Sequence, residues 1–558
     1  MQMIAIVQAR QSPHRVIDVD QELREAGLVQ RGEEIYEASI HTVTPRALEA
    51  VRRNREYIPN WRHIEGKLEK MLKEKERAQR TVRVEIDDGR MLFNTRVENE
   101  KLKRYLFATR NHWCIRLHKN RPMFTIPTRY FYWFKRELEK EGYTVEYEWK
   151  VKPVDLREAR DRFKKKYRLW EWQILADDAW NRRRRRGCVV AASASGKTVF
   201  AINEIISTSV KTAIIVPTEV LLEQWTYELE KMRIDPGVFY GREKNIKDVT
   251  VFVINSAAQY MPSHPETFSL VVQDECHHSA APKFAEAHDH LAPYALGISA
   301  TIEREDKRHL GQIYRTIGPK VYELTVPEAI RKGYLAPLEL YNIQIELTPE
   351  ERMAYDEVDY PIKRIMARYH GEFHRIVSDA SQGDPTASKC LRLIAERKKI
   401  LENAANKMPV IRWLVTQEPQ EKWLIFCEQI DRAERIRAEL GAGTTGIIHS
   451  EMKKAERYRQ LVLFETGKTN ILVSCRVIEE GYNVPEVKRA IIASGSSVKR
   501  QTIQRTGRLL RELGRLGGRT RTAKLWQIYA RGTKEEDYML ARTKALDANA
   551  VKYLRWTG

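Results

Sequence analysis

A loop with a glycine, a lysine and a threonine lies between an apolar run and a helix-like segment at residues 191–198. It reads AASASGKT, follows CVVAA and precedes VFAINEIIS. Backbone N–H groups of such a loop, together with the positive end of the following helix, hold phosphate groups. We expect Lys197 to reach the β and γ phosphates of a nucleotide and the Thr198 hydroxyl to bind Mg²⁺. The predicted nucleotide-binding residues here are Ser193, Ala194, Ser195, Gly196, Lys197 and Thr198.

Two adjacent carboxylates follow a later apolar run, LVVQ. A parallel strand would deliver Asp274 and Glu275 to the carboxyl edge of a sheet, where ligands bind in such folds. We expect Asp274 to hold Mg²⁺ and Glu275 to orient and deprotonate an attacking water. His277 completes an Asp-Glu-x-His pattern and would link this site to neighbouring loops. An ordinary acidic strand end, with His277 and His278 on the surface, is the alternative.

Two arginines one helical turn apart form a second candidate group near the C-terminus. The segment QRTGRLLR spans 504–511 and places Arg508 and Arg511 on one helix face. Paired guanidiniums can clamp a γ-phosphate from a facing domain, and such fingers typically change rates by about 10³–10⁵. A basic surface helix is the alternative, but it does not explain Gln504. In VIEEGYNVPE, which follows the strand-like run NILVSC, Glu480 and Gly481 lie where a motor would couple ribose or DNA contacts to domain closure.

The elements that position these residues alternate between apolar strands and helices. CVVAAS, TAIIVP, VTVFVIN, LVVQDE and ALGISA form one series, and KWLIFCE, TTGIIHS, NILVSC, RAIIAS and KLWQIYA form another. Alternation of this kind predicts parallel sheets flanked by helices. We therefore expect α/β domains at 165–335 and 416–545, a helical connector or insertion at 340–415, a small α+β domain at 78–150 and a charged, mostly helical region at 1–77.

Composition indicates a polyanionic partner. The 558 residues carry a net charge of +21, with an isoelectric point near 9.5. Nucleic acid is the usual partner of such a chain, although a well-solvated surface is the alternative.

The six cysteines form no CxxC pair, which favours buried thiols over a disulfide framework or a zinc site. The adjacent residues Cys276, His277 and His278 would rarely surround one metal ion. The first residues lack a secretory signal and no long apolar window is present, so we expect an intracellular, nucleoid-associated protein without a membrane partner.

Two further basic segments are ambiguous. Arg182–Arg186 is expected to lie beside the phosphate loop and is interpreted either as a phosphate contact or as a solvated helix end. RYFYWFKREL, at 129–138, interleaves aromatic and basic residues. Its rings could stack on unpaired bases, but such a run more often buries one helix face in its own domain.

With these motifs assembled, the chain resembles the DExH branch of superfamily 2 helicases over about residues 170–545. Gln173 in WEWQ is similar to the adenine-reading glutamine, IIVPTEVLLEQW to motif Ia, SAT (299–301) to motif III and VIEEGYNVP to motif V. The closest likeness is to the XPB group, because Arg304-Glu305-Asp306 follows the SAT motif and because GYLAP and ARGTKEED are also present. Ala191, Ala194 and Asn483 depart from the common motifs.

The resemblance implies two tandem RecA-like parallel-sheet domains that hydrolyse ATP with Mg²⁺ and drive 3′→5′ movement on DNA in repair, recombination or transcription-linked remodelling. It also implies that 78–150 corresponds to a DNA-recognition module and 340–415 to a thumb-like insertion. The resemblance further implies that His277, Ser299 and Thr301 couple the ATP site to DNA. Contacts to DNA would fall to Thr218, Arg304, Glu305 and Asp306.

Several alternatives stay open at this point. Within the motor class they are a duplex-DNA translocase without strand separation, an RNA helicase, and a restriction-type translocase with a separate nuclease partner. Outside it they are a nucleotide kinase and a binding module with a vestigial ATP site. The arginine pair on a second α/β domain argues against the kinase. Intact Lys197, Asp274 and Glu275 argue against the vestigial site.

Overall fold

The computed structural model describes most of the chain, with gaps. Contacts divide the chain into two compact units, Met1–Lys150 with Pro262–Pro265, and Val151–Met261 with Glu266–Gly558. The described residues are 4–8, 19–26, 28–32, 35–39, 43–56, 58–79, 81–87, 90–93, 114–118, 121–140, 142–147, 151–302, 312–475, 487–494, 522–546 and 550–557.

The first part of the N-terminal unit combines three helices with a small antiparallel sheet. The Thr44 side chain begins α2 by accepting a hydrogen bond from the Ala47 N–H at 3.1 Å, with Pro45 in the first turn. The prediction of a mostly helical region is therefore correct for the helices but missed a sheet of order β1-β3-β2. The elements are β1 (Ile4–Gln8), α1 (Val19–Glu25), β2 (Val29–Gly32), β3 (Ile35–Ser39), α2 (Pro45–Arg53) and α3 (Trp61–Gln79).

A five-stranded sheet of order β6-β7-β5-β4-β8 forms the second part of this unit. Phe131, Phe134 and Leu138 of α5 are buried at a spacing of three and four residues. One face of this aromatic-rich helix is thus buried in its own domain. Of the two interpretations of RYFYWFKREL, this is the one that did not involve stacking on bases. The elements are β4 (Thr81–Asp87), β5 (Arg90–Phe93), β6 (Cys114–His118), β7 (Arg121–Pro127), the 3₁₀ turn η1 (Thr128–Tyr130), α5 (Phe131–Lys140) and β8 (Thr144–Glu146).

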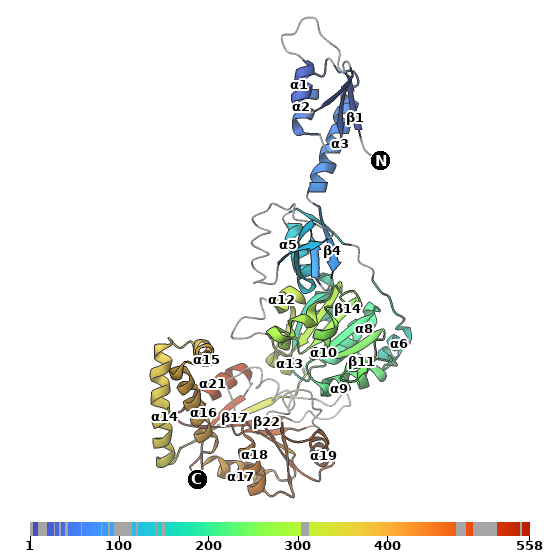
Figure 1. Cartoon of the computed structure of the whole chain (residues 1–558). Helices are drawn as coiled ribbons and strands as arrows, with labels where there is room; N and C mark the ends of the chain where they lie inside the picture. The colour runs from blue at the N-terminus through green and yellow to red at the C-terminus, as the bar shows by residue number, and fades with distance from the viewer. Residues whose placement is uncertain are drawn as a thin grey trace. The chain divides into compact units, whose positions relative to one another are not determined.

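The first α/β domain contains an eight-stranded sheet of order β12-β11-β13-β10-β14-β15-β9-β16, parallel except for β11 with β12 (Figure 1). All five predicted strands are present. The strands are β9 (Arg186–Ala191), β10 (Thr212–Val216), β11 (Gly237–Tyr240), β12 (Glu243–Lys244), β13 (Val249–Val253), β14 (Leu270–Asp274), β15 (Tyr294–Ser299) and β16 (Lys320–Leu324). The helices are α6 (Arg157–Lys166), α7 (Glu171–Arg182), α8 (Lys197–Thr208), α9 (Glu219–Glu230), α10 (Ile254–Tyr260), η2 (Cys276–Ala280), η3 (Pro282–His288), α12 (Ile313–Thr316) and α13 (Val326–Arg331).

The second α/β domain contains a seven-stranded sheet of order β19-β20-β18-β21-β22-β17-β23, and all its described strand pairs are parallel. The predicted helical segment 340–415 was wrong at its start, because residues up to 345 form β17 and helices begin only at Pro349. The strands are β17 (Leu338–Ile345), β18 (Trp423–Cys427), β19 (Thr445–His449), β20 (Ile471–Cys475), β21 (Arg489–Ile492), β22 (Ala523–Ala530) and β23 (Ala550–Arg555). The helices are α14 (Pro349–Arg368), α15 (Phe373–Ser381), α16 (Pro385–Glu402), α17 (Lys407–Gln417), α18 (Ile430–Leu440), α19 (Lys454–Glu465) and α21 (Lys534–Leu546).

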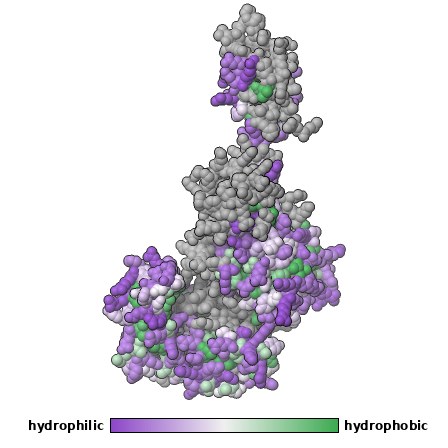
Figure 2. All heavy atoms as spheres, in the orientation of Figure 1, coloured by the Kyte–Doolittle hydropathy of each residue, from purple (hydrophilic) through white to green (hydrophobic). Residues whose placement is uncertain are grey.

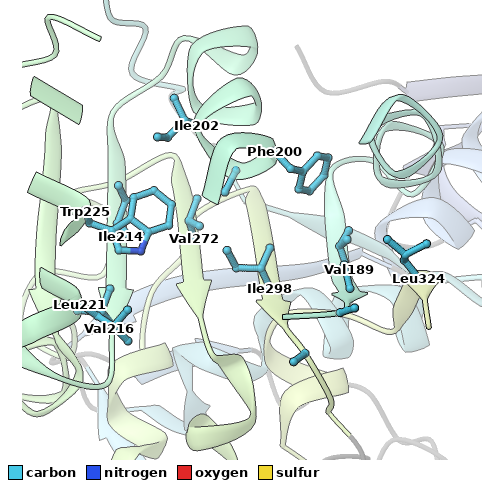
Figure 3. Close-up of a cluster of buried hydrophobic side chains, with 14 of the residues drawn as sticks. Val189, Phe200, Ile202, Ile214, Val216, Leu221, Trp225, Val272, Ile298 and Leu324 are labelled. Carbon is cyan, nitrogen blue, oxygen red and sulfur yellow. The ribbon is translucent and has the colours of Figure 1, made fainter. Parts of the chain in front are cut away.

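Helices pack apolar side chains onto the central strands of the first α/β sheet. Figure 3 shows Phe200 and Ile202 of α8 and Trp225 of α9 in one cluster with strand residues that include Ile214 and Val272. All five are buried in one core cluster. This burial is the main stabilising contribution to the layer and fixes the strand ends where the phosphate loop and the acidic pair begin. Among the described residues, every helix is too short or too polar to cross a membrane.

The basic run Arg182–Arg186 lies at the N-terminal end of β9, whereas the phosphate loop follows the opposite end of that strand. Arg186 donates to the carbonyl oxygen of Ala292 at 2.8 Å, and Arg182 pairs with Asp178 one turn earlier in α7. The expectation that the run lies beside the ATP loop is therefore wrong. Arg186 therefore ties the N-terminal end of β9 to the segment before β15, whereas Arg182 lies in an exposed ion pair on α7.

A buried carboxyl group lies in the helix that follows the phosphate loop. Glu204 of α8 is fully buried, and its Oε1 accepts a hydrogen bond from the Asn203 side chain at 3.0 Å. Burial, and then the negative charge of Asp177, raise the pKa of Glu204 from 4.5 to about 8. The protonated form is therefore favoured in the folded protein.

Glu204→Gln is expected to stabilise the first α/β domain at high pH and to change little at low pH. The raised pKa means that the folded protein binds this proton more tightly than the unfolded chain. The resulting stability is present below pH 4.5 and is lost as the pH rises toward about 8. Melting temperatures at about pH 5 and about pH 9 test this, with the exposed Glu230→Gln as the matched control. An equal shift at both pH values would show that Glu204 is not held protonated.

Candidate functional site

The predicted phosphate loop connects the carboxyl end of β9 to the first turn of α8. Gly196 precedes α8 with a left-handed φ of +87°, and Ala194 also adopts a positive φ of 65°. A side chain at Gly196 would be strained, and its Cβ would lie 3.0 Å from the Gln173 Nε2. The loop thus turns sharply and presents its backbone at the start of a helix, which is the geometry that holds phosphates.

Two side chains of the loop suit a phosphate ligand. The Ser195 hydroxyl is buried and has no hydrogen-bond partner among the residues that the structure describes. The Lys197 ammonium group lies over the loop, where it donates to the carbonyl oxygens of Ala191 at 3.1 Å and Ala192 at 3.4 Å. A buried donor without a hydrogen-bond partner and a cation at the start of the helix both gain by binding an anion. The residues therefore fit the triphosphate of ATP.

Gln173 lies against this loop. Its side chain is buried, the Oε1 accepts from the Trp170 N–H at 2.8 Å, and the Nε2 donates to the Gly196 carbonyl oxygen at 3.0 Å. The Trp170 ring stacks on Tyr334 with centroids 5.0 Å apart and planes at 14°. The amide therefore ties the start of α7 to the phosphate loop, and recognition of adenine by Gln173 stays a prediction.

The acidic pair lies at the carboxyl end of β14, as predicted. Asp274 is buried, its Oδ2 accepts from the Trp225 indole N–H at 2.8 Å, and its Oδ1 accepts from the Glu275 N–H at 2.8 Å. Burial, and then the charge of Glu275, raise the pKa of Asp274 to about 6, while Trp225 and Lys197 act in the opposite direction. Glu275 has a left-handed φ of 44°. Buried carboxylate oxygens beside the hydroxyl-bearing first turn of α8 are a donor set that suits Mg²⁺.

The Ser299 hydroxyl joins the predicted coupling residues to the acidic pair. Its Oγ lies 3.2 Å from the Glu275 Oε2, 2.9 Å from the His277 Nδ1 and 2.7 Å from the Thr301 carbonyl oxygen. A hydroxyl has one proton, so at any moment it donates to one acceptor: Glu275, the Thr301 carbonyl oxygen, or the His277 Nδ1 when that nitrogen carries no proton. The His277 Nδ1 is also 3.4 Å from the Glu275 Oε2. A change at Thr301 can therefore alter the hydrogen bonding of the Glu275 carboxylate.

Sequence reasoning missed Trp225 as part of this site. Trp225 lies on α9 inside the segment that resembles motif Ia, and it packs between α9 and the sheet (Figure 3). Forty-nine residues separate it from its hydrogen-bond partner Asp274. The sequence offered only one signal, a tryptophan within a motif. The order of the strands in the sheet brings the indole N–H and the carboxylate together, and sequence spacing does not reveal that order.

Trp225→Phe is expected to weaken activity with Mg²⁺ and ATP by about tenfold, because a hydrogen bond to a charged group contributes about 1.5–3 kcal/mol. The aromatic ring that fills the core is retained. Steady-state ATPase rates as a function of Mg²⁺ concentration provide the measurement. Trp180→Phe is the matched control, since its buried indole donates to the Ala295 carbonyl oxygen at 3.1 Å. Equal losses in the two variants would mean that Trp225 acts only through packing.

The remaining predicted residues have separate positions. Thr198 lies in the first turn of α8. Thr218 caps α9 by accepting from the Leu221 N–H at 3.3 Å, so it has a structural function that the DNA prediction did not foresee. The described part of the chain shows no group of three residues arranged for a metal, and five cysteines are free and buried there. Outside the described residues lie Arg304, Glu305, Asp306, Gly481, Gln504, Arg508 and Arg511.

Comparisons with known families agree with this geometry. Residues 157–304 match the family described as Type III restriction enzyme, res subunit, and residues 406–512 match the helicase conserved C-terminal domain. The two matched segments contain the phosphate loop, the acidic pair and the arginine pair. They fall on the two α/β domains.

Three relatives are named as a DNA 3′-5′ translocase or as DNA 3′-5′ helicases. The DNA 3′-5′ translocase XPB2 of Sulfurisphaera tokodaii is 31% identical over 390 residues, covering 68% of this chain and 85% of the relative. The DNA 3′-5′ helicases XPB of Kineococcus radiotolerans and Mycobacterium tuberculosis are 29% and 27% identical, and the chain covers 62% and 65% of their lengths. The chain therefore belongs to the XPB group of superfamily 2 helicases and translocases, a family of ATP-hydrolysing motor enzymes.

Proposed function

We propose that this protein hydrolyses ATP with Mg²⁺ to move 3′→5′ along DNA. The observation that carries the proposal is the cluster at the carboxyl edge of the first sheet. There the Glu275 carboxylate lies next to Asp274 and 3.2 Å from the Ser299 hydroxyl. The polarity and the DNA substrate are supported by the names of the relatives, a 3′-5′ translocase and two 3′-5′ helicases. The net charge of +21 suits a polyanionic track.

Each residue of the site has a distinct function in this proposal. Thr198 and Asp274 would hold Mg²⁺, which would offset the charge of the γ-phosphate of bound ATP. Lys197 and the backbone of the phosphate loop orient the phosphates. The Glu275 carboxylate accepts a proton from the attacking water. Arg508 and Arg511 contribute positive charge from the second α/β domain, and Gln504 lies in the same motif.

The coupling step follows from the hydrogen bonds of Ser299. When the hydroxyl donates to Glu275, it stabilises the charged carboxylate and makes it a weaker base. When the hydroxyl donates to the Thr301 carbonyl oxygen instead, Glu275 is the stronger base. Residues that follow Thr301, including Arg304, are those predicted to contact DNA. A DNA contact that shifts Thr301 would thus change the rate of hydrolysis.

Displacement of streptavidin from biotinylated single strands tests the polarity. A 3′→5′ motor removes streptavidin from the 5′ end with ATP and leaves it at the 3′ end. Displacement of a third strand from a triplex tests movement on duplex DNA, the alternative in which the strands are not separated. Removal from the 3′ end alone would contradict the proposed polarity. Movement on RNA alone would contradict the DNA substrate.

A further inference from the structure

The strand β23 forms one edge of the seven-stranded sheet in the second α/β domain. Within the part of the chain that the structure describes, it pairs with β17 alone. The strand at the opposite edge, β19, is covered, since four of its five residues are buried. By contrast, residues 552–555 of β23 are all exposed. Figure 2 shows mostly hydrophilic residues on the visible part of this domain, whereas Tyr553 and Leu554 of β23 have 58% and 41% of their surface exposed.

Alternate residues of β23 direct their backbone groups away from β17. The Trp556 N–H, directly after the strand, donates to the Gln344 carbonyl oxygen of β17 at 2.9 Å. The backbone groups of successive residues point to opposite sides of a strand, so every second residue before Trp556 also faces β17. The residues between them turn their N–H and C=O groups outward, where another strand can pair with them. These outward-facing residues are Val551, Tyr553 and Arg555.

The features that usually protect an edge strand from pairing are missing from β23. Such strands often carry a proline, a bulge or charged side chains that oppose pairing. β23 contains no proline, and its register with β17 is continuous. Its two charged side chains are directed back toward β17 and the residue that follows it. The Lys552 Nζ lies 3.3 Å from the Tyr341 hydroxyl oxygen, and the Arg555 Nη2 lies 3.6 Å from the Glu346 Oε1.

The order of side chains along β23 suits a second copy of the same strand. Two antiparallel copies related by a two-fold axis at Tyr553 would place the two tyrosines opposite each other. Lys552 would then face Leu554 of the second copy, and Arg555 would face Val551. All outward-facing residues are paired in this register, and no like charges are directly opposite, which favours pairing. A two-fold axis at Lys552 would instead place two lysines opposite each other.

We propose that two copies of this protein associate through antiparallel pairing of β23, which joins their two seven-stranded sheets into one. Such an interface uses the same surface on both copies, so the assembly closes at a dimer. None of the residues that form it belongs to the ATP site. The inference goes beyond the proposed function and does not depend on it.

Sedimentation velocity of the full chain over a range of concentrations, after nuclease treatment, tests this proposal. The wild type is expected to change from monomer to dimer as the concentration rises. Tyr553→Lys places two ammonium groups opposite each other at the axis and should raise the dissociation constant of the dimer about tenfold or more. Tyr458→Lys is the matched control, because Tyr458 is also exposed but lies on α19. Melting temperatures check that both variants fold.

A second variant tests the backbone pairing itself. Tyr553→Pro removes an N–H that faces outward and leaves the hydrogen bonds to β17 in place, as proline on an edge strand does. It should weaken the dimer without adding a charge. A Tyr553→Pro protein that folds and dimerises as the wild type does would overturn the strand pairing.

Salt distinguishes strand pairing from two basic chains that are bridged by a nucleic acid. Two copies with a net charge of +21 each repel one another, and salt screens this repulsion. The dimer fraction is therefore expected to rise with the NaCl concentration. A dimer that dissociates as salt increases would indicate a bridging polyanion and overturn the proposal. A monomer at every concentration, or equal dimerisation of the Tyr553→Lys and Tyr458→Lys proteins, would overturn it as well.

Discussion

Replacing Glu275 with glutamine is expected to lower the kcat of ATP hydrolysis by about 10²- to 10⁴-fold, the usual contribution of a general base. Glutamine keeps the size of the side chain and can still accept a hydrogen bond from Ser299, but it cannot take a proton from water. Binding of ATP should persist, because the phosphate loop and Asp274 are unchanged. The measurement is steady-state turnover at saturating ATP, with nucleotide affinity measured separately by a fluorescent analogue.

The matched control for this prediction is Glu323→Gln, which removes an exposed carboxylate that pairs with Lys320 on β16 at 2.6 Å. It should hydrolyse ATP at the wild-type rate. A Glu275→Gln protein with normal kcat would exclude Glu275 as the base. A protein that loses affinity for ATP while keeping kcat would instead assign Glu275 to nucleotide binding.

Lys407→Met is expected to destabilise the second α/β domain by about 3–5 kcal/mol, because it leaves a buried carboxylate without its cation. Lys407, at the start of α17, is fully buried, and its ammonium group lies 2.6 Å from the Glu535 Oε1 in α21. The other carboxylate oxygen of Glu535 accepts from the Ala530 N–H at 3.1 Å. Hydrogen exchange of amides in α17 and α21 measures the free energy of opening of this part of the domain.

Two further variants, compared with Lys407→Met, test this second prediction more strictly. The double variant Lys407→Met, Glu535→Gln removes both charges and should recover part of the lost stability. Lys454→Met removes an exposed cation that lies 2.6 Å from Glu223, and its effect should stay below about 1 kcal/mol. Equal effects of the Lys407 and Lys454 variants would show that burial does not govern the strength of these pairs.

The sequence predicted the strands that adjoin the chemistry better than it predicted β17, which lies between β22 and the edge strand β23. The predicted strands of both α/β domains are buried and strongly apolar, so their composition marks them. β17 was missed because LELYNIQI alternates and precedes a long helical segment. Its partner β22 lies 185 residues later at the Asn342–Gln527 pair. Such pairing depends on the whole chain and leaves little local signal.

The residues of the candidate site also differ in how well the sequence predicted their positions. The phosphate loop and the acidic pair were predictable because their residues are close in sequence and their chemistry fixes their spacing. The Trp225 contact to Asp274 and the cap that Thr218 forms on α9 were not, since each depends on how α9 packs and begins. The position of Arg182–Arg186 was misjudged because the run ends where β9 begins, at Arg186, whereas the loop starts at the other end of that strand.

The most direct test of the central claim is the steady-state ATPase rate without nucleic acid and then with single-stranded DNA, duplex DNA, forked DNA and RNA. The account predicts stimulation by DNA greater than by RNA, and loss of that turnover in Glu275→Gln. Preference for duplex DNA would favour translocation over strand separation. Turnover that depends on Glu275 but responds to none of these nucleic acids would contradict the claim that this ATPase is a DNA motor.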